Sequence, residues 1–136
     1  MAVKVRKTVE QKDIGKHIKE VTDYITSKDM AATADTTSGA STYTGAGVVN
    51  GVILRSGNTS GVTDVTPTAT QLLAAMGNPA IGDTFVFYVR NLNTSTGTVT
   101  LSGGTDVTLS GTTTCAINKT RMYVGKVTAV TAPAVT

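Results

Sequence analysis

The sequence has few of the residues that most catalytic and redox sites need. It contains one histidine, one cysteine and no tryptophan among 136 residues. A zinc site takes about four ligands, mostly Cys and His, and an intrachain disulfide takes a pair of cysteines. We therefore expect neither in this chain. Gly45 and Gly47 resemble the start of a dinucleotide-binding loop, but Asn50 stands where its next glycine belongs, so we expect no cofactor.

Aromatic and charged residues are also scarce, at 4% and 15% of the chain. Threonine is the commonest residue, with 27 copies, and 14 glycines accompany it. This composition favours short strands joined by turns over a helical bundle. No apolar run approaches the ~18 residues of a membrane-spanning helix, and the start MAVKVRK has no apolar signal-like stretch. We expect no membrane partner and synthesis in the cytoplasm.

Charge is concentrated at the N-terminal end of the chain. Residues 1–29 contain seven basic and five acidic residues, whereas residues 30–136 contain five and four. Valines near the start alternate as in a strand, and the row from Ile14 to Ile25 has helical spacing. Mixed charge beside an apolar stripe favours protein contacts over nucleic acid. We expect residues 1–29 to be a docking arm, with a solvated tail as the alternative. The expected partner-binding residues are Val3, Val5, Arg6, Lys7, Val9, Ile14, Ile18, Val21 and Ile25.

The rest of the chain divides into two parts. Residues 30–47 are small and hydroxyl-rich, which predicts a flexible connection or long loop. Residues 48–136 predict a β domain with a single helix over residues 67–76, because Pro67 opens that segment and Gly77 closes it. The spacing predicts an all-β sandwich, jelly roll or small barrel built from close-set hairpins. The predicted strands are 48–55, 84–92, 97–101, 106–109, 114–118 and 121–130.

Several single residues could act in catalysis or ligand binding, but each has a simpler structural interpretation. Asp64, Asp83 and Asp106 each stand beside Thr, Gly or Val in segments that resemble turns, where Asp accepts local backbone hydrogen bonds. His17 has no acidic residue placed to orient it, and Cys115 lies in a predicted strand, where a buried thiol is ordinary. We expect no acid/base pair, no nucleophile and no enzyme activity.

Residues 65–112 resemble a sequence pattern found in structural proteins of tailed bacteriophages, especially head decoration (cement) proteins. The shared elements are the PTATQLL helix, the GNP stop, the GDTF strand entry and Thr/Gly-rich hairpins with a TVTL-type strand. The resemblance covers about a third of the chain and excludes the arm. It implies a jelly-roll-like β-sandwich with one short helix and an extended arm, attached to the outside of an icosahedral head.

That resemblance implies a non-enzymatic virion protein that stabilises the shell by bridging neighbouring subunits. The expected partners are the major capsid protein and a second or third copy of this chain, as a homodimer or homotrimer. A fibre module that binds a receptor or carbohydrate is the alternative. Such a module should expose a cluster of aromatics, and this chain has only six aromatic residues. A small hydrolase or lyase is the third, weaker possibility.

Overall fold

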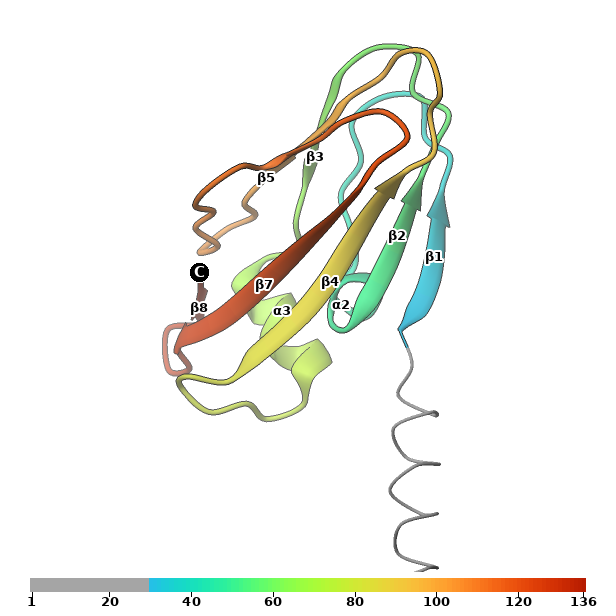
Figure 1. The fold of residues 1–136 in the computed structure, drawn as a ribbon. Helices are drawn as coiled ribbons and strands as arrows, with labels where there is room; N and C mark the ends of the chain where they lie inside the picture. Colours follow the sequence, from blue (N-terminus) through green and yellow to red (C-terminus); the bar gives the residue numbers. More distant parts are fainter. Residues whose placement is uncertain (1–29) are drawn as a thin grey trace, which may run out of the picture.

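The computed structural model describes residues 30–136, which form two sheets and two short helices (Figure 1). The larger sheet has the order β1-β2-β4-β7-β8 and the smaller one the order β3-β5-β6. The strands are β1 (Ala31–Asp35), β2 (Gly51–Arg55), β3 (Val62–Val65), β4 (Thr84–Asn91), β5 (Val99–Ser102), β6 (Thr114–Cys115), β7 (Thr120–Ala129) and β8 (Ala134–Val135). The helices are α2 (Gly45–Val48) and α3 (Ala69–Met76).

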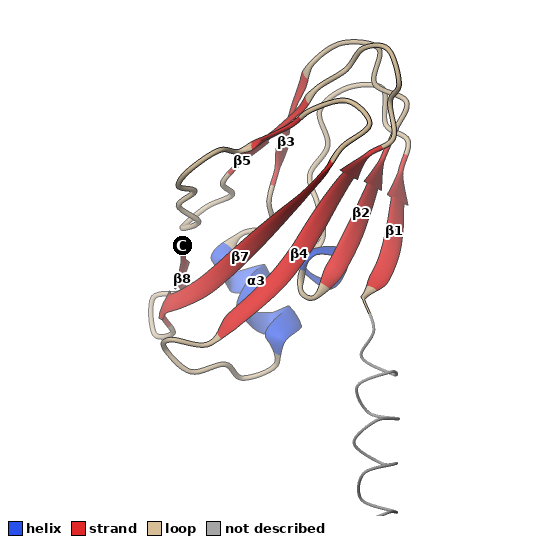
Figure 2. Cartoon of the chain, viewed as in Figure 1, coloured by secondary structure: helices blue, strands red, loops and turns tan. Residues whose placement is uncertain are grey.

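The two sheets lie in separate layers. The smaller sheet and both helices cover one side of the larger sheet, which we call the inner face (Figure 2). The core between the layers takes Phe85, Phe87 and Val89 from β4, Leu72 and Leu73 from α3, and buried residues from most other elements. The prediction of an all-β, sandwich-like fold is therefore confirmed for the described residues.

The pairing of the strands is mixed rather than antiparallel. β1 pairs with β2, β2 with β4, and β3 with β5 in parallel, while β4–β7, β5–β6 and β7–β8 are antiparallel. A jelly roll is built from antiparallel strands, so this topology does not confirm the jelly roll. The expectation of close-set hairpins is wrong for most of residues 30–136, where only β5–β6 and β7–β8 are sequential antiparallel neighbours.

The helix predicted over residues 67–76 is confirmed as α3. Its N-terminus has a capping box: the Thr68 hydroxyl accepts from the Gln71 amide, and the Gln71 side chain accepts from the Thr68 amide. Gly77 closes the helix with a positive φ of 72°. Leu72 and Leu73 are buried against the sheet, so tertiary packing stabilises this short helix.

Several predicted segments differ from the structure. Residues 30–47, predicted as a flexible connection or long loop, supply the edge strand β1, most of α2 and the buried Tyr43. Residues 106–109, predicted as a strand, form only one bridge, from Val107 to Val135. Asp106 has a positive φ of 61° there, which interrupts an extended backbone. The strand predicted to begin at residue 48 begins at Gly51 instead.

Candidate binding face

The arm residues predicted to bind partners lie outside the described residues. These are Val3, Val5, Arg6, Lys7, Val9, Ile14, Ile18, Val21 and Ile25, and His17 lies there too. The structure therefore describes only the surfaces that such an arm, or another protein, would meet. Three features of residues 30–136 qualify as candidates: a buried charge cluster, a cavity and the outer face of the larger sheet.

The charge cluster joins Arg55 on β2 to Asp64 on β3, so it bridges the two sheets. Both side chains are fully buried, and the Arg55 Nε donates to an Asp64 carboxylate oxygen at 2.8 Å. The Tyr43 hydroxyl donates to the same oxygen at 2.7 Å, and the Ser41 amide donates to the other one at 2.8 Å. The remaining Arg55 donors reach backbone carbonyls of Thr37, Gly39 and Ser56.

The electrostatics of this cluster favour one fixed protonation state. Burial, and then the hydrogen bond to Asp64, raise the pKa of Tyr43, so its hydroxyl stays a donor. Burial opposes the charge of Arg55, but the hydrogen bond and charge of Asp64 outweigh it and raise the pKa of Arg55. For Asp35, hydrogen bonds from Ser41 and Thr37 and the charge of Arg55 outweigh burial and lower the pKa.

All these groups are used internally, so the cluster holds the loop between β1 and α2 against both sheets. A buried charge needs such a partner set, because an unpaired one costs several kcal/mol, roughly 3–5 when one partner is removed. The prediction that Asp64 lies in a turn is wrong, since Asp64 is inside β3. Sequence reasoning missed Arg55 as well. The alternation of side chains along the strand could have revealed it, because Arg55 lies on the buried side of β2 with Gly51 and Ile53.

The other single candidates occupy ordinary structural positions. The Asp83 carboxylate accepts from the Ala80 amide in a turn, and Asp106 stands in a turn with its positive φ, as predicted for turn aspartates. Cys115 is 1% exposed and packs in the core, which confirms that prediction. Asn58, whose tripeptide formally matches a glycosylation pattern, is buried and donates to Ser60 and Gly97 carbonyls.

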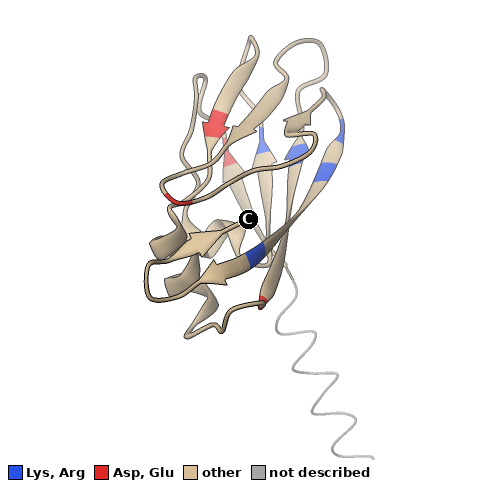
Figure 3. Cartoon of the chain, turned by 90° about the vertical axis from the view of Figure 1, so that its left-hand side faces the viewer, with Lys and Arg blue, Asp and Glu red and all other residues tan. Residues whose placement is uncertain are grey.

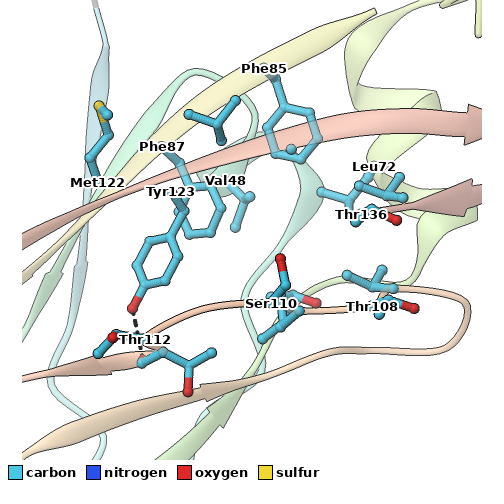
Figure 4. A pocket seen from close by; sticks show the side chains of 17 residues that line it. Val48, Leu72, Phe85, Phe87, Thr108, Ser110, Thr112, Met122, Tyr123 and Thr136 are labelled. Carbon is cyan, nitrogen blue, oxygen red and sulfur yellow. Dashed lines mark hydrogen bonds between the residues drawn. The ribbon is translucent and has the colours of Figure 1, made fainter. Parts of the chain in front are cut away.

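A cavity of about 150 Å³ lies between the inner face of the larger sheet and the loop after β5 (Figure 4). Phe85, Phe87 and Tyr123 form one wall, and hydroxyls of the loop form the other. Phe87 stacks on Tyr123 with ring centroids 4.9 Å apart. The Tyr123 hydroxyl donates to the Thr113 carbonyl at 2.9 Å, which ties the sheet to this loop.

The chemistry of this cavity is that of a packing gap. Its titratable side chain is Tyr123, and burial, together with the nearby Cys115 thiol, raises the pKa of Tyr123 to about 12. Phe85 and Phe87 are only 3% and 4% exposed, so their rings offer no open platform to a sugar. The cavity therefore supplies neither a general acid or base near neutral pH nor an aromatic stacking surface.

The outer face of the larger sheet carries several large apolar residues. Alternation along β4 buries Phe85, Phe87 and Val89 inward and leaves Val86 and Tyr88 outward. The register continues this outward row across neighbouring strands. We call this side of β2, β4 and β7 the outer face. Its large apolar residues are Val52, Leu54, Val86, Tyr88, Met122 and Val124. Met122 and Val124 are 55% and 56% exposed.

Charge on the outer face has one sign among the described residues. Of the five described Lys and Arg residues, which Figure 3 shows along this sheet, Arg55 and Arg121 lie on the inner rows of β2 and β7. Arg90 shares the outward row of β4 with Tyr88, and Lys126 shares that of β7 with Val124. The four described aspartates lie elsewhere: at the end of β1, within β3, before β4 and in the loop after β5.

Within residues 30–136, no group of three or more His, Cys, Asp or Glu is placed to hold a metal ion. The two helices described are too short for either to cross a membrane. No protein-family model matches the chain, and neither a curated protein nor a solved structure is significantly similar to it. The candidate binding face therefore rests on geometry and chemistry alone.

Proposed function

We propose that this protein is a structural virion protein that binds the outside of an icosahedral phage capsid and stabilises the shell by bridging neighbouring subunits. The observation that carries the proposal is the outer face, where six large apolar side chains lie beside Arg90 and Lys126. Contiguous apolar surface of this kind marks protein interaction sites in soluble proteins. In this proposal the major capsid protein and further copies of this chain, as dimers or trimers, are the partners.

The proposal combines this face with the resemblance of residues 65–112 to head decoration proteins. It needs a rigid β body and a separate segment that reaches a neighbour, and it does not depend on a jelly-roll topology. The described body meets the first need, because the Arg55–Asp64 pair joins its two sheets. Residues 1–29 would meet the second, since a fully extended segment of that length reaches about 95 Å. The protein would act without catalysis or cofactor, on the capsid surface.

The test uses head particles of the encoding phage, assembled without this protein and then mixed with it. We expect electron microscopy to show added density on the outer surface, and the coated heads to withstand higher temperature than bare heads. A chain lacking residues 1–29 should occupy fewer sites, because bridging needs the arm. Bare heads that gain no density from the intact protein at saturating concentration would refute the proposal.

A matched pair of variants assigns the contact to the outer face. Val124→Glu places an acidic side chain on the outer face, and Thr70→Glu places one at an exposed position of α3, on the other side of the sheet. We expect Val124→Glu to reduce occupancy and Thr70→Glu to leave it unchanged. The fibre-module alternative predicts glycan or cell binding instead, which a glycan array would detect. The buried positions of Phe85 and Phe87 do not favour it.

A further inference from the structure

We infer that the cavity between the larger sheet and the loop after β5 binds a small, uncharged apolar molecule the size of one six-membered carbon ring (Figure 4). The inference goes beyond the proposed function and does not depend on a capsid surface or on residues 1–29. It rests on three properties of the cavity: its volume, the pairing of its polar groups, and the few hydrogen bonds that hold the loop over it.

The volume and the apolar walls of the cavity fit a single ring. The cavity measures about 150 Å³, and an apolar cavity of about that volume holds one benzene molecule. Phe85, Phe87 and Leu72 line it from the sheet and α3, and each is at most 4% exposed. Val107 and Leu109 line it from the loop and pack against the same core. A ring between these walls would contact carbon on both sides.

Polar groups that line the cavity beside these apolar residues already have partners within the protein. The Tyr123 hydroxyl donates to the Thr113 carbonyl at 2.9 Å. The Thr66 hydroxyl accepts from the Gly104 amide at 2.9 Å and donates to the Pro67 carbonyl at 3.1 Å. A buried water takes about two to four polar partners. Since these groups are already used, they hold water in the cavity only weakly.

The cavity also contains no buried polar side chain in need of a ligand or water. Within residues 30–136, the single buried side-chain nitrogen or oxygen without a hydrogen-bond partner is Arg121 Nε, and Arg121 does not line the cavity. The lining hydroxyls of Thr108, Ser110 and Thr112 belong to exposed residues of the loop, which solvent reaches. Displacement of water by an apolar ring therefore costs few hydrogen bonds, and burial of the ring is favourable.

The same walls disfavour charged and sugar-like ligands. No Asp, Glu, Lys or Arg side chain is among the described residues that line the cavity. An ionised ligand would lose its hydration there without gaining a side chain of opposite charge, and the hydroxyls of a sugar would be left without partners. The ligand class is therefore a neutral ring or a short branched hydrocarbon.

Hydrogen bonds hold the loop over the cavity only at its two ends. The Thr108 amide donates to the Val135 carbonyl at 2.9 Å, and the Thr113 carbonyl accepts from the Tyr123 hydroxyl. Between these points, residues 109–112 form no backbone hydrogen bond to any other part of residues 30–136. A segment with so few backbone hydrogen bonds opens at a lower free-energy cost than the sheet does. Opening of this loop gives the ligand its entry path.

The test is titration of the full-length protein with benzene and, in parallel, with 1,4-dioxane, a ring of similar size that carries hydrogen-bond acceptors. The methyl chemical shifts of Leu72, Leu109 and Val135 report on the cavity. We expect saturable shifts with one benzene per chain and a Kd on the order of 1 mM, because each ring carbon contributes about as much as one buried methylene. Dioxane should bind at least about ten times more weakly. The thermal midpoint should rise with benzene concentration.

A matched pair of variants locates the ligand. Val107→Phe adds a ring to a half-buried valine that lines the cavity, and Val62→Phe adds the same ring to a half-buried valine that packs on the core elsewhere. We expect Val107→Phe to weaken benzene binding at least tenfold and Val62→Phe to leave it unchanged. Leu109→Phe fills the cavity from a second loop position and gives the same test if Val107→Phe does not fold.

Three outcomes would overturn the inference. They are methyl shifts that grow with benzene concentration without saturating, equal affinity for benzene and dioxane, and unchanged benzene affinity in the folded cavity-filling variants. The coating of heads is a separate measurement. Benzene binding without coating would refute only the proposed function, and coating without benzene binding would refute only the cavity site.

Discussion

The ring of Phe85 fills the space beside Gly125: a Cβ at position 125 would lie 2.3 Å from the Cε1 and Cζ atoms of that ring. The two residues are register partners on β4 and β7. The aromatic ring covers a glycine that contributes no side chain of its own to the inner face. This contact explains why a glycine stands in the middle of β7, the longest strand within residues 30–136.

We expect Gly125→Ala to destabilise the protein by about 1–3 kcal/mol, because Phe85 must leave its position in a packed core. Urea unfolding followed by circular dichroism measures the change. Gly39→Ala is the matched control, since nothing lies within 4 Å of a Cβ there, and it should change stability by less than about 0.5 kcal/mol. Equal effects of the two substitutions would show that the Phe85 contact has no energetic role.

Removal of Asp64 should be more severe. Asp64→Ala leaves the Arg55 guanidinium fully buried without its carboxylate, and the expected loss is about 3–5 kcal/mol. Asp106→Asn is the control, because Asp106 is exposed and Asn tolerates its positive φ. Denaturant midpoints of the two variants give the comparison. A loss below about 1 kcal/mol for Asp64→Ala would mean that solvent reaches the guanidinium, against the burial described above.

Local features of this fold could be read from the sequence, and long-range ones could not. α3 was predictable because its signals are close in sequence: Pro67 precedes the helix and Gly77 follows it. β4 was predictable from its apolar run. β1 was missed because Ala31, Ala32 and Ala34 have low strand propensity. Pairing with β2 overrides that propensity.

Parallel pairing and the charge cluster depend on contacts between distant residues. Thr/Gly-rich turns favour hairpins, yet β3 pairs in parallel with β5 across α3 and β4, which no local signal encodes. Arg55 and Asp64 are nine residues apart and lie in different sheets. The outer face could be predicted only in part. The apolar run of β4 predicts either burial on both faces or an interface, and in the described part of the chain one of its faces has no layer packed on it.

Two neighbours on β4 test which face belongs to the core. Phe87 is 4% exposed and stacks on Tyr123, so Phe87→Ala should cost about 3–5 kcal/mol. Tyr88 is half-buried on the outer face, and Tyr88→Ala should cost less than half as much in the free protein. Thermal and urea unfolding of both variants give the values. Reversed magnitudes would place the core on the outer side of β4.

Alkaline pH should unfold the protein through its buried tyrosines. Burial and the nearby Cys115 raise the pKa of Tyr123 from 10.0 to about 12, and burial with Asp64 raises the pKa of Tyr43. The two tyrosine hydroxyls therefore bind their protons more tightly in the folded state than in the unfolded state. Their contribution to stability is complete below the unfolded pKa near 10 and is lost as the pH rises toward about 12 and beyond.

The measurement is the free energy of unfolding, determined in urea at several values between about pH 8 and pH 12. Stability of the native sequence should fall across the upper half of that range. Tyr123→Phe removes the hydrogen bond to Thr113 and should lower stability by about 1 kcal/mol at neutral pH. It should also make the alkaline decline shallower, because one titrating group is gone. A decline equally steep in Tyr123→Phe would assign the alkaline sensitivity to groups other than Tyr123.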